Sequence, residues 1–267
     1  MGSNTAAPTR IGIVGYGFIG QALAAAVTEA PDLSLAFVWN RSPEALADLP
    51  RELVLDDLGR AAGRGADLIV EVAHPDITRE HGARLLAHAD YMPVSVSALV
   101  DDDLRAGLAA AAAAAGRRVF VPAGALMGLD ALRAGRGHWA EVTITFRKHP
   151  RNLDFSASGV DPSGIAGETV LYDGPVRGIA RLYPRNINTM ITCALATTGL
   201  DACRGRLVAD PALDIAIAEV EAVGTDGATL SMVKRQPVRG VSGTEMIASI
   251  LRSVGDACGS GETLTFV

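Results

Sequence analysis

The chain is poor in aromatic residues and has no excess of positive charge. Phe, Trp and Tyr make up 4% of its 267 residues, and the formal net charge is -6 at pH 7. A protein that binds nucleic acid through the phosphate backbone needs a basic face, and this composition offers no source for one. The sequence therefore argues against nucleic-acid binding.

Long uncharged apolar runs are also lacking. The alanine-rich stretch 109–116 is far shorter than the roughly 18 residues that a membrane-spanning helix needs, and Arg105, Arg117 and Arg118 flank it. Residues 1–10 lack the apolar centre of a secretory signal and predict a disordered tail. We therefore expect a soluble, cytoplasmic protein without membrane contact.

Cysteine is scarce as well. The three cysteines, Cys193, Cys203 and Cys258, are an odd number and show neither CxxC nor Cys/His ligand spacing. This pattern favours buried structural thiols over metal ligands or a nucleophile, and no metal site is predicted.

A glycine motif stands out among the residues that are present. The stretch IGIVGYGFIGQALAAAV, residues 11–27, has three glycines spaced as GxGxxG between a predicted strand and a predicted helix. The first glycine permits a tight turn, the second lets the backbone approach a pyrophosphate, and the third lets helix and strand pack closely. The alternative is a glycine-rich turn without a ligand. The predicted cofactor-binding residues of this motif are Gly15, Gly17, Phe18, Ile19 and Gly20.

The first 122 residues alternate between predicted strands and helices, which indicates an α/β fold. Five or six parallel strands with helices between them would form a doubly wound Rossmann sheet. Strands are predicted at 10–17, 33–40, 66–75, 91–99 and 117–124, and helices at 18–30, 76–89 and 101–116.

Beyond residue 140, strand-like segments dominate and predict a second α/β domain with a mostly antiparallel sheet. The strands are expected at 141–149, 169–176, 204–210, 215–224 and 227–235, with helices at 188–199 and 242–257. We expect a dinucleotide-binding domain at 11–122, completed by a C-terminal helical segment at 241–267. The segment 123–240 is expected to form a substrate-binding and dimerisation domain.

The end of the second predicted strand bears on the choice of dinucleotide. An acidic side chain here would bind the adenosine ribose, but the sequence has Asn40 followed by Arg41 and Ser42. Arg41 and Ser42 can bind a 2'-phosphate through charge-assisted hydrogen bonds. We therefore predict NADP as the preferred cofactor, with NAD as the alternative. Arg41 could instead stack on the adenine of either one.

Other predicted strand ends lie at the same cofactor edge. Ala73 and His74 follow the strand at 66–75, and Ser97 and Ala98 end the segment 91–99. We expect these four residues near the dinucleotide, although His74 could also be an ordinary loop residue.

Eight motifs follow one another along the chain between residue 11 and about residue 255. They are GYGFIGQAL, VWNR, VEVAHP, VPAGALMGLDAL, FRKHP, LYDGPVRG, YPRNINTM and RLVAD. Taken together, they resemble the L-aspartate dehydrogenase family, in particular its animal-type and related bacterial members. The resemblance implies an N-terminal Rossmann domain, a C-terminal domain whose sheet supports a homodimer, and interconversion of L-aspartate with iminosuccinate or with oxaloacetate and ammonia.

A dicarboxylate or its imine needs cations and amide donors around it. Arg147 and Lys148 end a predicted strand, where neighbouring side chains point to opposite faces, so only one should enter the site. We favour Lys148; the alternative is two solvated charges. Asn186 and Asn188 precede a helix and could cap it or bind substrate, and the resemblance favours Asn188. The predicted floor of the cleft is formed by Gly124 and Ala125.

The sequence departs from the family at one position with a proposed role. Many members carry a histidine shortly after the VAD segment, as acid/base or water-positioning residue, and the resemblance places Ala216 there. The absence favours an enzyme that works in the reductive direction, because hydride transfer to an imine needs positioning more than a base. The alternatives are a reductase of another imine or carbonyl compound and a catalytically impaired dinucleotide-binding homologue. All five histidines precede this position: His74, His81, His88, His138 and His149.

The segment 234–246 also departs from the family. It lacks the Asn-Pro-Lys-Thr-Ser run that is common in microbial members, so no role is transferred to its residues.

Overall fold

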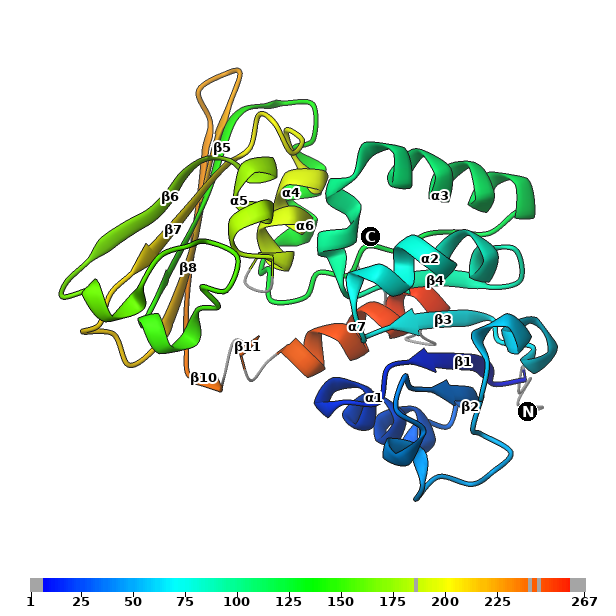
Figure 1. Cartoon of the computed structure of the whole chain (residues 1–267). Helices are drawn as coiled ribbons and strands as arrows, with labels where there is room; N and C mark the ends of the chain where they lie inside the picture. The colour runs from blue at the N-terminus through cyan, green and yellow to red at the C-terminus, as the bar shows by residue number, and fades with distance from the viewer. Residues whose placement is uncertain (1–6, 185–186, 240–241, 244–245, 260–267) are drawn as a thin grey trace. The chain divides into compact units, whose positions relative to one another are not determined.

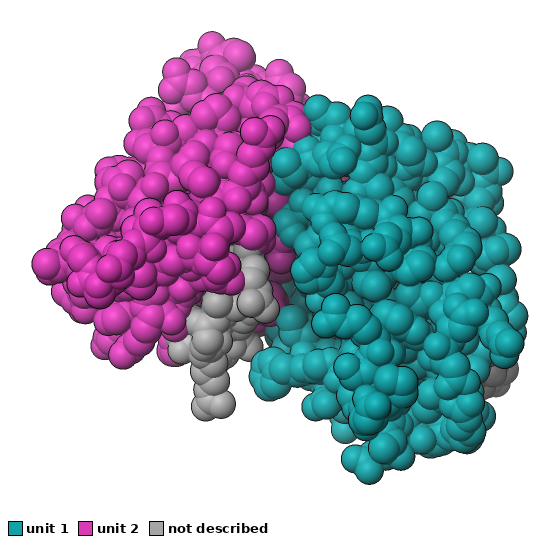
Figure 2. Space-filling view, in the orientation of Figure 1, with its two compact units in different colours: residues 1–122, 247–267 teal, residues 123–246 magenta. Residues whose placement is uncertain are grey.

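The structure is a computed structural model that describes residues 7–184, 187–239, 242–243 and 246–259. The chain forms two compact units (Figure 2). Unit 1 comprises Met1–Pro122 and Ile247–Val267, and unit 2 comprises Ala123–Met246. In the described part of the chain, no helix is long and apolar enough to cross a bilayer.

Unit 1 is built on a parallel sheet with the strand order β2-β1-β3-β4 (Figure 1). The first strand lies between β2 and β3, so the second strand is added on one side of β1 and the later strands on the other side. α/β folds bind ligands at the point where the strand order changes side in this way. Both faces of β1 are covered, since the neighbouring residues Ile13 and Val14 point to opposite faces and are both fully buried. The strands are β1 (Thr9–Val14), β2 (Leu33–Trp39), β3 (Leu68–Glu71) and β4 (Asp90–Pro93).

Among its described residues, unit 1 contains four α-helices (Figure 1). The helix α1 (Phe18–Glu29) contacts β1 and β2, whereas α2 (Pro75–Leu86) contacts β3 and β4 and packs against α3 (Asp102–Ala115). The last helix, α7 (Met246–Cys258), buries Ile250 and enters unit 1 at residue 247. Short 3-10 helices also occur in this unit: η1 (Pro43–Leu46), η2 (Leu58–Arg64) and η3 (Val96–Val100).

Two of the predicted strands differ in the structure. The segment 91–99 leaves the sheet after Pro93, because the backbone N–H and hydroxyl of Ser95 bind the Glu71 carboxylate instead of a neighbouring strand. The segment 117–124 contributes only a bridge between Val119 and Tyr91. The described sheet of unit 1 therefore has four strands, where five or six were predicted.

Unit 2 is a five-stranded sheet with the order β6-β7-β5-β8-β9, and helices cover one of its faces (Figure 1). Neighbouring strands are antiparallel except β5 and β7, so the sheet is mostly antiparallel, as predicted. The strands are β5 (Trp139–Lys148), β6 (Thr169–Pro175), β7 (Arg204–Ala209), β8 (Ala216–Gly224) and β9 (Thr229–Gln236), followed by the short pair β10 (Val238–Arg239) and β11 (Ser242–Gly243). The helices are α4 (Leu129–Ala134), α5 (Val176–Leu182) and α6 (Asn188–Ala196), with 3-10 turns η4 (Pro150–Asn152) and η5 (Pro162–Gly164).

Side chains alternate between the two faces of this sheet. On β5, Ile144, Phe146 and Lys148 are buried on the face that contacts α6, which we call the inner face. The predicted structural role of the cysteines agrees with the burial of Cys193 and Cys203, and Cys258 is half-buried.

Candidate active site

The glycine loop between β1 and α1 has backbone requirements that only glycine meets at two positions. Gly15 has φ +109, a conformation that L side chains rarely adopt. A Cβ on Gly20 would lie 2.0 Å from the carbonyl oxygen of Gly15, so the helix could not pack as closely on the loop. A Cβ on Gly17 would meet no atom within 4 Å. The loop is therefore tight at its first and third glycines and open at its second.

This open space lies at the N-terminus of α1. Gly17 is the N-cap, without a side chain to bind the first N–H groups, and the first turn contains no acidic residue. Phe18 is 77% exposed and Ile19 is half-buried. Free N–H groups and the positive end of the helix dipole suit an anion such as a pyrophosphate. The loop thus fits a dinucleotide cofactor.

The end of β2 is tied to the glycine loop through Asn40. Its Oδ1 accepts a hydrogen bond from the Tyr16 N–H at 3.0 Å, and its Nδ2 donates to the Ser42 carbonyl at 3.0 Å. Asn40 thus holds the turn together. Arg41 and Ser42 are exposed beside it, and Arg41 makes no ion pair with any residue in the described ranges.

A buried carboxylate organises the ends of β3 and β4. Glu71 is fully buried, and its Oε1 accepts hydrogen bonds from the N–H groups of Ala73 at 2.7 Å and His74 at 2.8 Å and from the Ser95 hydroxyl at 2.9 Å. Its Oε2 accepts from the Ser95 N–H at 3.2 Å. Burial raises the pKa of Glu71 to about 7, against the lowering effect of these donors. No motif in the sequence predicted a role for Glu71.

The remaining predicted cofactor neighbours are His74, which follows β3, and Ser97 and Ala98, which follow β4. His74 is the exposed N-cap of α2, and its Nδ1 accepts from the Asp76 N–H at 3.3 Å. Ser97 and Ala98 lie in η3 instead of at a strand end, with only 8% and 0% of their surfaces exposed. Their burial leaves them little surface with which to contact a ligand.

In unit 2, three buried residues lie side by side in a row on the inner face of the sheet. Two of them, Lys148 and Ala216, are predicted site residues, and the third is Gln236. Arg147 pairs with Ile217 at the end of the β5–β8 ladder, so the next residues, Lys148 and Ala216, are neighbours. Ala216 in turn pairs with Gln236 on β9. All three members of the row are buried: Lys148, Ala216 and Gln236.

Lys148 is an unusual cation, because only 9% of its surface is exposed. Its Nζ lies 5.3 Å from the centre of the Phe146 ring, and desolvation lowers the pKa of its amine to about 8. The ammonium form therefore still predominates at neutral pH. A buried ammonium of this kind suits the carboxylate of a small acid.

Arg147 lies on the opposite, outer face, as the alternation along a strand requires. Its guanidinium is 3.0 Å from the Glu168 carboxylate and 3.3 Å from the Glu219 carboxylate. Two carboxylates already compensate this cation, and the placement does not favour a substrate-binding role.

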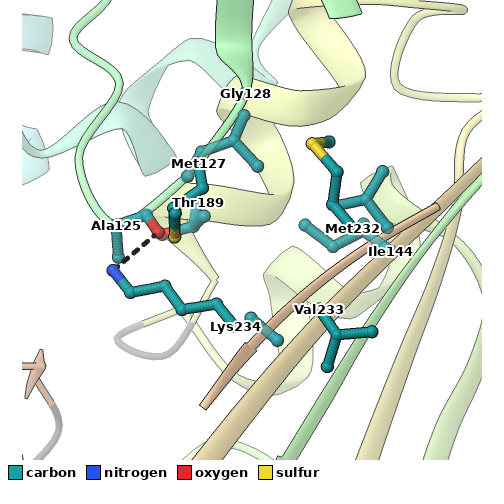
Figure 3. Close-up of a pocket in the computed structure, with 11 residues that line it drawn as sticks. Ala125, Met127, Gly128, Ile144, Thr189, Met232, Val233 and Lys234 are labelled. Carbon is teal, nitrogen blue, oxygen red and sulfur yellow. Dashed lines mark hydrogen bonds between the residues drawn. The ribbon is translucent and has the colours of Figure 1, made fainter. Parts of the chain in front are cut away.

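Of the predicted amide and cleft-floor residues, the structure describes Asn188, Gly124 and Ala125. Asn188 is the first residue of α6, whose N-cap is Ile187, whereas Asn186 lies outside the described residues. Gly124 has φ +57, which turns the chain before Ala125. The Ala125 carbonyl accepts a hydrogen bond from the Lys234 Nζ at 3.5 Å (Figure 3).

These last two residues line a cavity of about 360 Å³ in unit 2 (Figure 3). Most of its lining is apolar, including Ile144 and Met232, and Lys234 is its charged side chain. Ala218 also lines it, two residues after Ala216 on the same strand and face. The cavity therefore begins next to the row formed by Lys148, Ala216 and Gln236.

Adding a side chain at Gly17 should weaken dinucleotide binding without destabilising the fold. The residue has φ -81, which other residues adopt, but the new side chain would occupy the space beside the free N–H groups. We expect Gly17→Val to raise the Kd for NADPH by about tenfold or more, about 1.4 kcal/mol, in a fluorescence titration, with an unchanged Tm. Gly20→Ala is the contrasting variant and should lower the Tm. Normal NADPH binding by Gly17→Val would contradict the assignment of this loop.

Comparisons with known proteins agree with this arrangement. The model of the C-terminal region of aspartate dehydrogenase matches residues 130–253, and that of the NAD binding domain of homoserine dehydrogenase matches residues 15–122. The chain is 38% identical over 240 residues to an aspartate dehydrogenase domain-containing protein of Danio rerio, covering 86% of this chain and 87% of that protein. It is 38% identical over 211 residues to L-aspartate dehydrogenase 2 of Bordetella pertussis, covering 76% and 78%.

A solved structure matches this chain over nearly all of its length. The crystal structure of aspartate dehydrogenase from Thermotoga maritima superposes with a TM-score of 0.76 at 26% identity, covering 97% of this chain and 99% of that one. The resemblance drawn from the sequence is thus confirmed, as is the α/β fold class. The chain belongs to the aspartate dehydrogenase family and is an NAD(P)-dependent oxidoreductase.

Proposed function

We propose that this protein is an amino-acid dehydrogenase of aspartate dehydrogenase type that works mainly as a reductive aminase. In that direction oxaloacetate, ammonium, NAD(P)H and a proton give L-aspartate, NAD(P)⁺ and water, by way of iminosuccinate. Unit 1 binds the dinucleotide through the glycine loop, and unit 2 binds the acid. When bound, the dinucleotide supplies the hydride.

The observation that carries this proposal is the buried ammonium of Lys148. A cation with 9% exposure and a pKa of about 8 is still charged at neutral pH, and in a dry environment it forms a strong charge-assisted hydrogen bond with the carboxylate of a small acid. It lies beside the small side chain of Ala216, which leaves room for a substrate. We assign Lys148 the binding of a substrate carboxylate, and we assign the amide of Asn188 a supporting contact.

The reductive direction is favoured because Ala216 has no group that can accept or donate a proton, and oxidation of an amino acid depends on proton transfer more than reduction of an imine does. Oxidation of an amino acid requires removal of a proton from its ammonium group and then hydrolysis of the imine, steps to which a positioned acid/base contributes about 10²- to 10⁴-fold. Hydride addition to an imine depends more on orientation and on the electron-poor carbon. An alanine in the row therefore impairs oxidation more than reduction.

The direct test follows NADPH absorbance with oxaloacetate, with and without ammonium, and with an NADH control. Oxidation of NADPH that requires ammonium supports reductive amination. Oxidation without ammonium would instead identify a carbonyl reductase. A protein that binds NADPH but oxidises it under neither condition would overturn the proposed substrate.

We also propose a preference for NADP over NAD, supported by the exposed Arg41 and Ser42 beside the fixed Asn40. Arg41→Ala is expected to raise the KM for NADPH about tenfold, the loss of a charge-assisted hydrogen bond of about 1.5 kcal/mol or more, and to leave the KM for NADH unchanged. Steady-state kinetics with both cofactors measure this. Equal increases for the two cofactors would instead assign Arg41 to the adenine.

A homodimer is the proposed assembly, formed through the outer face of the unit 2 sheet. Large apolar side chains are exposed there: Val170, Val223 and Val233 are 45%, 37% and 51% exposed. The same face carries the charged side chains of Arg147 and Glu219, and a mixture of exposed apolar and charged side chains is compatible with a subunit interface. Sedimentation velocity would show the dimer, and Val233→Glu should shift it towards the monomer.

A second candidate substrate is favoured by the cavity beside the row. Its volume of about 360 Å³ is larger than the side chain of aspartate requires. Its lining is mostly apolar, whereas that side chain is a carboxylate. A 2-oxo acid with a larger apolar side chain would fill it. Such acids belong in the same NADPH assay, and a higher kcat/KM than with oxaloacetate would replace aspartate as the proposed product.

A further inference from the structure

Gln236 carries a buried polar atom without a partner in the described part of the chain. The residue is 9% exposed, and its Oε1 is buried and accepts no hydrogen bond. A buried acceptor left unpaired costs about 1–3 kcal/mol. Such atoms are rare in native proteins and require an explanation, for which a ligand is one candidate.

The register of the sheet places this atom at the proposed substrate site. Gln236 pairs with Ala216, and Ala216 is the neighbour of Lys148, so the three lie side by side on β9, β8 and β5. Directly opposite Cβ atoms in an antiparallel pair are about 4.5–5.5 Å apart. Lys148 and Gln236 thus flank the small Ala216 from both sides.

The two long side chains offer opposite hydrogen-bonding chemistry. The Lys148 ammonium can only donate, whereas the Gln236 Oε1 can only accept. A carboxylate satisfies the first group and cannot satisfy the second. An amino acid, its imine or ammonia provides the N–H that the second group lacks.

We propose that the Oε1 of Gln236 binds the nitrogen of the substrate, by accepting a hydrogen bond from ammonia, from the imine or from the ammonium group of the amino acid. The inference rests on the proposed function and adds a nitrogen subsite to it. Lys148 holds the carboxylate on one side of Ala216, and Gln236 holds the nitrogen on the other. Gln236 therefore contributes to the choice of an amine over a carbonyl substrate.

The test compares Gln236→Met, an apolar side chain of similar length, with Gln236→Glu, which keeps an acceptor oxygen. For Gln236→Met we expect the KM for ammonium to rise about tenfold, while the KM for oxaloacetate and the Kd for NADPH stay within about twofold. Gln236→Glu should recover much of the ammonium affinity. Removal of an unpaired acceptor should leave the Tm of Gln236→Met unchanged or higher, whereas a purely structural role would lower it.

A binding experiment without turnover completes the test. Calorimetry of the NADP⁺ complex should show tighter binding of L-aspartate than of succinate, which has the two carboxylates but no nitrogen. Gln236→Met should abolish this difference. Equal ammonium KM values in wild type and Gln236→Met would overturn the inference, and so would an increase confined to the Kd for NADPH, which would assign Gln236 to the cofactor.

Failure of the proposed function is distinguishable from failure of this inference. A wild-type protein that binds NADPH but neither L-aspartate nor succinate, and shows no ammonium-dependent turnover, contradicts the function itself. A wild-type protein that turns over oxaloacetate with ammonium and is indifferent to Gln236→Met contradicts only the nitrogen subsite.

Discussion

Lys148→Met is expected to give a protein that is more stable and much less active. Burial lowers the pKa of Lys148 from 10.5 to about 8, so the folded state bears a desolvation cost at pH 7. Methionine fills a similar volume without the charge. We expect the free energy of unfolding to rise by about 1 kcal/mol, since the contact with Phe146 and the other interactions of the Lys148 ammonium offset part of the cost.

The same variant should lose substrate binding. Removal of a charge-assisted hydrogen bond to a carboxylate corresponds to about 1.5–3 kcal/mol, or about a 10- to 100-fold fall in kcat/KM for oxaloacetate. Steady-state kinetics and urea unfolding measure the two effects. Gains in stability at the expense of activity are typical of residues kept for function. A Lys148→Met protein with normal kinetics would remove the observation that carries the proposed function.

Arg147 provides a matched comparison one residue away on the outer face. Arg147→Met breaks the ion pairs with Glu168 and Glu219, which are partly exposed. We expect a modest loss of stability, of about 1 kcal/mol or less, and an unchanged kcat/KM. The two variants should thus change stability in opposite directions.

The stability of the wild type should depend on pH through Lys148 with a defined sign. Between about pH 8 and pH 10.5 the folded state has released the lysine proton while the unfolded state retains it. The unfolded state then binds more protons, so this contribution to stability rises with pH across that window. Substrate affinity should fall over the same range, because the neutral amine no longer attracts a carboxylate.

The sequence predicted the fold well wherever a pattern is local. The strand and helix around the GxGxxG motif and the antiparallel strands of unit 2 follow from apolar periodicity. The strand predicted at 91–99 was wrong after Pro93, because the Ser95 N–H donates to the side chain of Glu71, 24 residues earlier, and not to a neighbouring strand. A long-range hydrogen bond of this kind leaves no periodic signal in the segment that it bends.

In the candidate site, too, features that depend on one strand could be predicted, and features that depend on the pairing of distant strands could not. Strand alternation correctly placed Arg147 and Lys148 on opposite faces, since it depends on one strand alone. Gln236 could not be identified, because its position beside Ala216 depends on the register between β8 and β9. Glu71 lay within a predicted apolar strand, where a charged residue was itself a signal of buried hydrogen bonds.

Glu71→Leu is expected to be the most destabilising substitution at the cofactor edge. The carboxylate accepts hydrogen bonds from the N–H groups of Ala73, His74 and Ser95. Leucine leaves these donors without a partner, at about 1–3 kcal/mol each, so we expect a loss of about 3 kcal/mol or more in the free energy of unfolding. The loops that follow β3 and β4 should lose their fixed positions, and NADPH binding should weaken with them.

Glu71→Gln separates the role of the charge from that of the hydrogen bonds. Burial raises the pKa of Glu71 from 4.5 to about 7, so between these values the folded state retains a proton that the unfolded state has released. This contribution to stability is complete below pH 4.5 and is lost as pH rises through 7, by about 3 kcal/mol in all. Glutamine cannot titrate, yet its Oε1 can still accept from Ala73 and His74. Urea unfolding at pH 5 and pH 8 should therefore show a smaller fall for Glu71→Gln than for the wild type, whereas equal falls would mean that Glu71 is ionised throughout and that the donors around it outweigh its burial.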